Sequence, residues 1–325
     1  MKIAIPDDYQ DAVRTLDCFQ KLNWHEVMIT HEHLSDPDAL AARLQGVQAL
    51  VLIRERTLID EALLARLREL RLIVQTGKRA PHLDLAACTR HGVAVVFAAP
   101  AQQGRPYATA ELTWGLILAA MRSIPQEVAS MKAGQWQRTL GRVLHGRTLG
   151  IFGYGNIGSL VAVYGQAFGM RVQVWGREGS RIRARADGIE VAASQDALFR
   201  DADILSLHLS LTDETRGIVS AADLAQMKPS ALFVNTSRAA LVAPGALEAA
   251  LRAGRPGYAA VDVYEHEPVS DHPLLHLDNV VCTPHLGYVE KENYESIFGG
   301  AFEQLLAFAA GDRTKVVNPD AFRRA

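Results

Sequence analysis

Short apolar runs alternate with amphipathic stretches along the first hundred residues. Residues 37–45 and 59–69 have helical spacing, and Ile59, Leu63 and Leu67 recur every four positions. Continuous apolar runs that alternate with helices predict a parallel sheet covered on both faces. We expect its strands at Lys2–Ile5, Ala49–Ile53, Leu72–Thr76 and Ala94–Val96.

A second alternation of the same kind follows a longer helical segment. That segment runs from Thr109 to Ala133, with a break expected at Pro125. A final helical run covers Glu290 to Ala310. The predicted fold class is therefore α/β, with two doubly wound parallel-sheet domains. We expect the strands of the second domain at Thr148–Phe152, Arg171–Trp175, Ile204–His208, Ala231–Asn235, Tyr258–Asp262 and Val280–Cys282.

The length of the chain fits this organisation. Its 325 residues suggest about two domains at the usual ~100–200 residues each. We expect the final helix to return to the first domain, which makes that domain discontinuous. The first domain then comprises residues 1–100 and 290–325, and residues 101–289 form the second.

Charge and cysteine content narrow the class of protein. Lys and Arg number 34 against 36 Asp and Glu, and this net charge of −2 does not favour nucleic acid or an anionic membrane as a partner. The most apolar helical stretch, Leu112 to Met121, is far shorter than the ~20 residues that span a bilayer. The acidic start does not resemble a signal peptide. Cys18, Cys88 and Cys282 lack the spacing of metal ligands, so we expect reduced thiols, no metal and a cytoplasmic protein.

A glycine-rich turn joins a predicted strand to a predicted helix at residues 148–158. Gly153, Gly155 and Gly158 have G-x-G-x-x-G spacing: the first allows a tight turn, the second lets the backbone approach a pyrophosphate, and the third lets the helix pack on the strand. The N–H groups at the start of the helix suit the phosphates. We therefore predict dinucleotide binding at Gly153, Tyr154, Gly155, Asn156, Ile157 and Gly158.

The position after the next strand bears on the choice between NAD and NADP. An acidic side chain is expected about 20 residues beyond the glycines, where it binds the ribose 2′-hydroxyl. No Asp or Glu lies between Arg147 and Arg177. Gly176 leaves room at this position, and the Arg177 guanidinium suits a 2′-phosphate. We expect NADP to be preferred, with Glu178 as the alternative partner for a 2′-hydroxyl.

Three polar segments follow predicted strands of the second domain: Asn235–Arg238, Asp262–Pro268 and Thr283–Gly287. Each lies at the carboxyl end of a parallel strand, the edge where open α/β sheets bind ligands. In this order, behind the glycine turn, they resemble the Arg, Glu and His motifs of the D-isomer-specific 2-hydroxyacid dehydrogenases. The resemblance covers nearly the whole chain, and it implies a Rossmann-type dinucleotide-binding domain and a flavodoxin-like substrate domain.

The resemblance also assigns roles that suit the chemistry. Hydride transfer to a 2-oxo carbon leaves an alkoxide that must be protonated, a task for which an imidazole is suited. His285 is the candidate acid/base and Glu267 its carboxylate partner, while Arg238 is the cation that polarises the carbonyl. The residues expected near the cofactor are His208, Thr236, Ser237 and Asp262.

The substrate carboxylate is expected to bind to the first domain. In the family, backbone N–H groups of a loop bind this carboxylate, and the matching candidates in this chain are Gly77, Lys78 and Arg79. The family commonly has a second glycine where this chain has Arg79. Arg54 is a further candidate, with a structural ion pair as the alternative interpretation. Glyoxylate, hydroxypyruvate, phenylpyruvate-like and branched 2-oxo acids all remain open as substrates.

The resemblance further implies a homodimer formed through an arm at Ile124–Val143. Two other functions compete with the 2-oxo acid reductase. A formate-type dehydrogenase has the same fold, but such relatives lack the Glu partner that Glu267 provides in this chain. A nucleotide-sensing, corepressor-like binding protein can retain all three motifs, so the sequence alone does not separate it from an enzyme.

Overall fold

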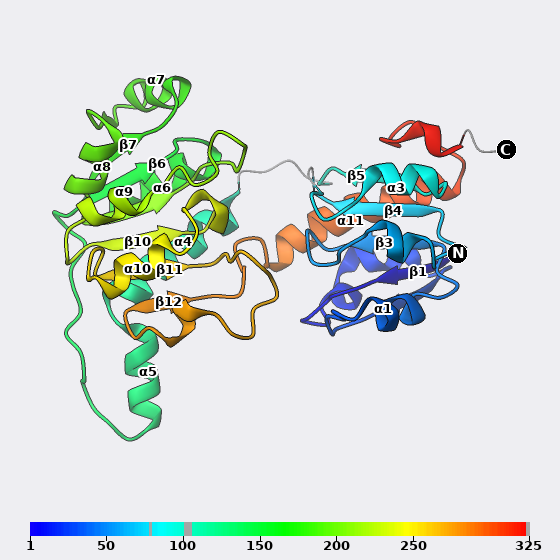
Figure 1. Ribbon diagram of the computed structural model, residues 1–325, viewed down its shortest axis with the longest axis horizontal. Coiled ribbons are helices and arrows are strands. Elements are labelled where there is room, and N and C mark those ends of the chain that lie inside the picture. The colour runs from blue at the N-terminus through cyan, green and yellow to red at the C-terminus, as the bar shows by residue number, and fades with distance from the viewer. Residues whose placement is uncertain (78–79, 101–105, 323–325) are drawn as a thin grey trace. The chain divides into compact units, whose positions relative to one another are not determined.

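The chain divides into two compact units, each built on one parallel sheet (Figure 1). The computed structural model describes residues 1–77, 80–100 and 106–322. Unit 1 comprises Met1–Gly104 and Glu290–Ala325, and unit 2 comprises Arg105–Val289. The predicted α/β class with two parallel-sheet domains is confirmed.

The sheet of unit 1 contains the strands β1 (Lys2–Ile5), β2 (Glu26–Ile29), β3 (Ala49–Leu52), β4 (Leu72–Thr76) and β5 (Ala94–Ala98). Their order across the sheet is β2-β1-β3-β4-β5, the flavodoxin-like arrangement. One apolar cluster joins side chains of this sheet to the helices α1 (Pro37–Arg43), α2 (Glu61–Leu64) and α3 (Leu85–Arg90). A later helix, α11 (Lys291–Ala309), packs against β4 and β5 and thereby completes the unit.

The sheet of unit 2 contains the strands β6 (Thr148–Phe152), β7 (Arg171–Trp175), β8 (Glu190–Val191), β9 (Ile204–Leu207), β10 (Leu232–Asn235), β11 (Tyr258–Val261) and β12 (Val280–Cys282). Their order is β12-β11-β10-β9-β6-β7-β8, and all of these strand pairs are parallel. The strand order reverses between β6 and β9. Such a switch point is where doubly wound sheets bind ligands.

Two apolar clusters cover the two faces of this second sheet, because successive strand residues point to opposite sides. Phe152 and Phe233 belong to the first cluster, which includes the helices α8 (Gln195–Asp201), α9 (Ala221–Gln226) and α10 (Ala246–Arg252). Ile151 and Val234 belong to the second, which includes α4 (Tyr107–Met121) and α6 (Asn156–Ala167). This two-sided burial explains why the strands are apolar along their whole length.

The helix expected at residues 59–69 is wrong in extent, because α2 is a single turn. Ile59 instead pairs with Leu83 in an isolated bridge. The Asp60 carboxylate accepts the Leu63 N–H at 2.8 Å and so starts the helix after Ile59. The apolar residues at every fourth position therefore reflect the burial of Ile59 and its neighbours and do not indicate one continuous helix.

The helix break expected at Pro125 lies earlier in the chain. Ser123 has a left-handed φ of 50° and separates α4 from α5 (Ile124–Lys132). Pro125 then stands in the first turn of α5, where its missing N–H leaves no bond unmade. Within the described ranges, no helix is long and apolar enough to cross a membrane.

Candidate active site

His285 and Glu267 meet within unit 2. Nδ1 of His285 lies 2.5 Å from Oε2 of Glu267, and the other oxygen of Glu267 accepts the backbone N–H of Tyr264 at 3.0 Å. His285 has a φ of 52°, a left-handed conformation that residues other than glycine seldom adopt. The contact with Glu267 occupies Nδ1, so Nε2 is the ring atom that a substrate would meet.

The charge of Glu267 is set by opposing effects. Burial raises the pKa of Glu267. A larger combined effect lowers it, and this comes from the hydrogen bond and charge of His285, the Tyr264 N–H and the positive charge of Arg238. The net direction is downward, so the carboxylate is charged at neutral pH.

Arg238 follows β10 in a turn organised by Asn235. The Asn235 side chain accepts the Ser237 N–H and donates to the Arg238 carbonyl, both at 3.0 Å. Nη1 of Arg238 donates to the Ser237 carbonyl at 2.7 Å. The hydroxyl of Ser237 donates to a carbonyl of β9, and that of Thr236 lies 2.8 Å from the Thr113 hydroxyl. Both hydroxyls thus stabilise the turn, and their assignment to the cofactor stays a prediction.

Asp262 organises the loop that carries His285. Its buried carboxylate accepts the Thr283 hydroxyl at 2.6 Å and the backbone N–H groups of Leu286 and Gly287 at 2.7 and 2.9 Å. Burial raises the pKa of Asp262, against the opposing effect of these hydrogen bonds. The contacts give Asp262 a positioning role that sequence reasoning did not identify.

Thr109 and Tyr264 also bind this loop, and sequence reasoning missed both. The Thr109 hydroxyl donates to the Gly287 carbonyl at 2.7 Å, and the Tyr264 hydroxyl donates to the Thr283 carbonyl at 3.1 Å. Tyr264 stands inside the Asp262–Pro268 motif, which was an available signal. Thr109 lies on α4, far away in sequence, and no local pattern marks it.

The turn between β6 and α6 has the shape that a dinucleotide needs. A Cβ on Gly158 would lie 2.2 Å from the Gly153 carbonyl oxygen, and a Cβ on Gly153, where φ is 103°, would lie 2.6 Å from the His208 carbonyl oxygen. A Cβ on Gly155 would meet nothing within 4 Å. Two glycines therefore pack the turn tightly, while the third leaves room for a pyrophosphate at the N-terminus of α6.

The remaining predicted residues of this turn differ in their surroundings. Asn156 and Ile157 begin α6, which no side chain caps. Tyr154 is buried, and burial together with its 2.8 Å hydrogen bond to Asp187 raises its pKa to about 12. The phenol is therefore a neutral structural group.

His208 follows β9 and lies beside the turn. Its Nε2 is 2.9 Å from the Ser206 hydroxyl, and Nδ1 is buried without a hydrogen-bond partner among the described residues. Burial lowers the pKa of His208 to about 3. The ring is thus neutral at physiological pH and does not donate protons, while Nδ1 leaves hydrogen-bonding capacity next to the glycine turn.

The position that follows β7 carries both a cation and an acid. Gly176 and Arg177 precede α7 (Glu178–Ala186). The Arg181 guanidinium lies 4.7 Å from the centre of the Trp175 ring. A pocket of about 380 Å³ at this position is lined by Arg177, Glu178, Gly179, Ser180 and Arg183.

Two of the predicted substrate residues lie together in unit 1. Arg54 follows β3 and Gly77 follows β4, which are neighbouring strands. A Cβ on Gly77 would lie 2.9 Å from Nη1 of Arg54, so the guanidinium lies against the glycine backbone. The Arg54 N–H donates to the Thr76 hydroxyl at 2.9 Å. Lys78 and Arg79 lie outside the described residues.

Comparisons with known proteins relate this chain to a family of dehydrogenases. A family model described as D-isomer specific 2-hydroxyacid dehydrogenase, NAD binding domain, matches residues 114–287. Glyoxylate reductase from Aeropyrum pernix is 38% identical over 300 residues, covering 89% of this chain and 88% of the relative. D-3-phosphoglycerate dehydrogenase from Methanocaldococcus jannaschii is 35% identical over 324 residues, covering 98% of this chain but 59% of the relative.

A solved structure agrees with these matches. The crystal structure from Ralstonia solanacearum, provisionally described as a D-3-phosphoglycerate dehydrogenase oxidoreductase, has 54% sequence identity and a TM-score of 0.94. The match covers 98% of this chain and 97% of that chain. The fold and the glycine turn therefore define an oxidoreductase with a nicotinamide cofactor.

More particularly, the chain belongs to the D-isomer-specific 2-hydroxyacid dehydrogenases, which confirms the resemblance carried by its three motifs. The two curated relatives are named as a reductase and a dehydrogenase. Neither of them favours the corepressor-like or formate-type alternative.

Proposed function

We propose that the protein catalyses the reversible reduction of a small 2-oxo acid to the D-2-hydroxy acid. The observation that carries this proposal is the 2.5 Å contact between His285 and Glu267 in the unit that also contains the glycine turn. The bound nicotinamide cofactor supplies or accepts the hydride. His285 donates a proton from Nε2 to the alkoxide oxygen formed at C2, and Glu267 orients the imidazole and favours its charged form.

Arg238 polarises the substrate carbonyl in this proposal. Its planar guanidinium can donate two parallel hydrogen bonds to the substrate, which an ammonium cannot do. Unit 1 serves as the substrate domain, where Arg54, Gly77, Lys78 and Arg79 bind the carboxylate. Residues 101–289 serve as the dinucleotide-binding domain.

The relatives support small acids as substrates. One is named for glyoxylate and another for 3-phosphoglycerate. Turnover of glyoxylate, hydroxypyruvate, 3-phosphohydroxypyruvate and phenylpyruvate, each with NADH and NADPH, tests the proposal. We expect a higher kcat/KM with one of the first three acids than with phenylpyruvate. Absence of turnover with every acid, in a protein that still binds the cofactor, would reject the enzyme and favour the corepressor-like alternative.

We also propose that NADPH is preferred over NADH. Gly176 stands where an acid would repel a 2′-phosphate, and Arg177 lines the adjoining pocket. The matching family model is described as NAD binding, and Glu178 lines the same pocket. The proposed preference for NADPH therefore depends on Arg177, and it is tested separately from the choice of substrate.

A homodimer and a cytoplasmic location complete the proposal. The segment from α5 to residue 143 presents large apolar side chains to solvent: Trp136 is 73% exposed and Leu140 is 96% exposed. Burial of such side chains contributes ~1.5–3 kcal/mol each. A second copy of the chain would provide that burial, as the family resemblance implies.

A further inference from the structure

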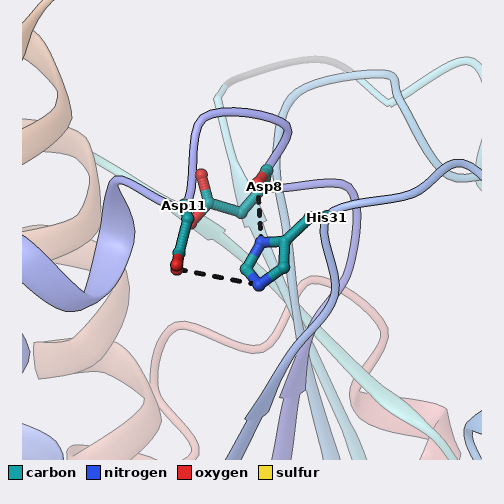
Figure 2. Close-up of side chains that lie close together, drawn as sticks. All are labelled: Asp8, Asp11 and His31. Carbon is teal, nitrogen blue, oxygen red and sulfur yellow. Dashed lines mark hydrogen bonds and ion pairs between the residues drawn. The ribbon is translucent and has the colours of Figure 1, made fainter.

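Two carboxylates and an imidazole come together in unit 1, on side chains that the proposed reaction does not use (Figure 2). Asp8 and Asp11 lie in the loop after β1, and His31 follows the neighbouring strand β2. One carboxylate oxygen from each acid and one ring nitrogen of His31 lie within 4.8 Å of one another. We propose that these three side chains bind a divalent transition-metal ion.

Asp8 provides the observation that points to a cation. Its side chain is fully buried, and Oδ2 accepts the Val13 N–H at 2.9 Å. Oδ1 is buried with no hydrogen-bond partner among the described residues. A buried carboxylate oxygen without a partner is unfavourable, because it has lost its hydrogen bonds to water and no protein group replaces them. A metal ion bound to this oxygen removes that penalty.

His31 is oriented as a metal ligand. Its Nδ1 lies 3.0 Å from the Asp8 carbonyl oxygen, and because a carbonyl only accepts, Nδ1 carries the hydrogen. In the neutral ring, Nε2 then has its lone pair available on the side of Asp11, whose Oδ1 is 3.7 Å away (Figure 2). Metal-bound imidazoles commonly donate their second N–H to a backbone carbonyl in this way.

The spacing between His31 and Asp11 also suits an ion. The 3.7 Å between Nε2 and Oδ1 is too long for a hydrogen bond. An ion that lies ~2.0–2.2 Å from each atom bridges such a gap. Asp11 Oδ1 also contacts Nε of Arg14 at 2.5 Å, and both side chains are half exposed. Because exposed ion pairs contribute little to stability, a cation can replace Arg14 there.

The donor set determines the class of ion. One imidazole with two carboxylates suits Zn²⁺ and similar transition ions, whereas Ca²⁺ and Mg²⁺ prefer oxygen ligands throughout. Zn²⁺ is the probe of choice, because its affinity for a nitrogen and oxygen site is high among the divalent ions. The ion would join the loops that follow β1 and β2, and no step of the proposed reaction runs through it.

A second His–Asp contact in the same two loops provides a matched control. Nδ1 of His33 lies 3.2 Å from Oδ1 of Asp7, whose Oδ2 accepts the Thr57 hydroxyl at 2.5 Å. Both oxygens of Asp7 are therefore engaged. The substitution His33→Gln removes an imidazole two residues from His31 and leaves the proposed ligands in place.

Calorimetric titration of the chelator-treated full chain with ZnSO4 tests the site. Wild type and His33→Gln should bind one ion per chain with the same affinity. His31→Gln and Asp8→Asn should each weaken that binding by about ten-fold or more, since even the loss of a group that only hydrogen-bonds to a ligand costs ~10–100-fold. Arg14→Gln should strengthen it, because Asp11 no longer pairs with the guanidinium.

Thermal unfolding distinguishes loss of the site from failure to fold. Zn²⁺ should raise the Tm of wild type and His33→Gln but not that of His31→Gln, whose imidazole lies near the surface. Without Zn²⁺, Asp8→Asn should unfold at or above the wild-type Tm, because it replaces a buried carboxylate whose Oδ1 has no hydrogen-bond partner among the described residues. Equal Zn²⁺ affinity in wild type and in Asp8→Asn/His31→Gln overturns the proposal, as does tighter binding of Ca²⁺ than of Zn²⁺. Neither result depends on dehydrogenase activity.

Discussion

The Asp262 carboxylate and the Thr283 hydroxyl are joined by a 2.6 Å hydrogen bond that fixes the start of the His285 loop. Asp262→Asn should disturb this loop, because an amide NH₂ cannot accept the N–H groups that the carboxylate binds. We expect kcat to fall by about 10²-fold, the cost of misplacing a reacting group by ~1 Å. The Kd for the reduced cofactor should change little.

Steady-state kinetics and a fluorescence titration of the cofactor measure these two effects. Asp271→Asn is the control, since Asp271 forms an exposed ion pair with His276 and should affect neither value. An unchanged kcat in Asp262→Asn would show that the loop is positioned by other contacts, such as those of Thr109 and Tyr264.

The lowered pKa of Glu267 gives the reaction a pH dependence of definite sign. A carboxylate with a depressed pKa contributes stability above its unfolded pKa, and this contribution is lost as pH falls through the folded pKa. The Glu267–His285 contact should therefore persist at neutral pH and break only in acid. Turnover in both directions should therefore fall in acid, as Glu267 gains a proton and its contact with His285 breaks.

Glu267→Gln tests the carboxylate directly. An amide has no carboxyl group to titrate, so the variant should be slower at neutral pH and should lose the acid decline of the wild-type rate. Profiles of kcat/KM against pH in both directions measure both effects. If the variant and wild-type profiles coincide while chemistry limits the rate, the Glu267 carboxylate does not position His285.

The glycine turn predicts opposite effects for two similar substitutions. Gly158→Ala places a Cβ against the Gly153 carbonyl, so it should destabilise unit 2 by ~1–3 kcal/mol or more. Gly155→Ala meets no protein atom, and as an N-cap change it should cost at most ~1 kcal/mol. Its methyl group would nevertheless occupy the space expected for the pyrophosphate, so cofactor affinity should fall. Denaturation midpoints and cofactor titrations compare the two, and unaltered affinity in Gly155→Ala contradicts the assigned binding mode.

Cofactor preference can be tested at Arg177. Charge-assisted hydrogen bonds contribute ~1.5–3 kcal/mol, so Arg177→Ala should reduce the NADPH preference by roughly ten-fold or more. Arg185→Ala, on the helix α7 that follows Arg177, is the control. The double change Gly176→Asp with Arg177→Ala should reverse the preference. Because Gly176 has a φ of 158°, the Tm of the double variant must also be measured. If the wild type favours NADH, Glu178 or a backbone group binds the ribose 2′-hydroxyl instead.

The exposed apolar side chains after α5 predict the oligomeric state. Light scattering coupled to size-exclusion chromatography should give the mass of a dimer at micromolar concentration. Trp136→Glu with Leu140→Glu should shift the protein to a monomer, because charges in a buried apolar interface are unfavourable. A wild-type monomer, or a double variant that still dimerises, would exclude this arm as the interface.

The sequence predicted most of the sheet because the central strands are buried on both faces. The strand Leu72–Thr76, for example, is buried along its whole length and was predicted with its observed bounds. The edge strand β2, Glu26–Ile29, was missed: its three apolar residues stand between polar and charged ones, and none of its side chains is fully buried. An edge strand needs fewer apolar residues because one side of it has no neighbour.

Motifs in the sequence proposed members of the candidate site but not the contacts between them. Motif order identified His285 and Glu267, whereas their 2.5 Å contact depends on the left-handed backbone at His285. No sequence pattern marks Asp8 and His31, which lie 23 residues apart. Ligands that follow neighbouring parallel strands are separated by a whole strand and loop, so no short motif records them.

The return of α11 to unit 1 has a consequence for the order in which the protein folds during synthesis. Phe298, Phe302 and Leu305 of α11 are fully buried, so the apolar surface that they cover stays open while residues 105–289 are being made. Unit 2 is continuous in sequence and can fold as soon as its last strand leaves the ribosome. The part of the chain that is translated first is therefore completed last, and it depends longest on protection from aggregation.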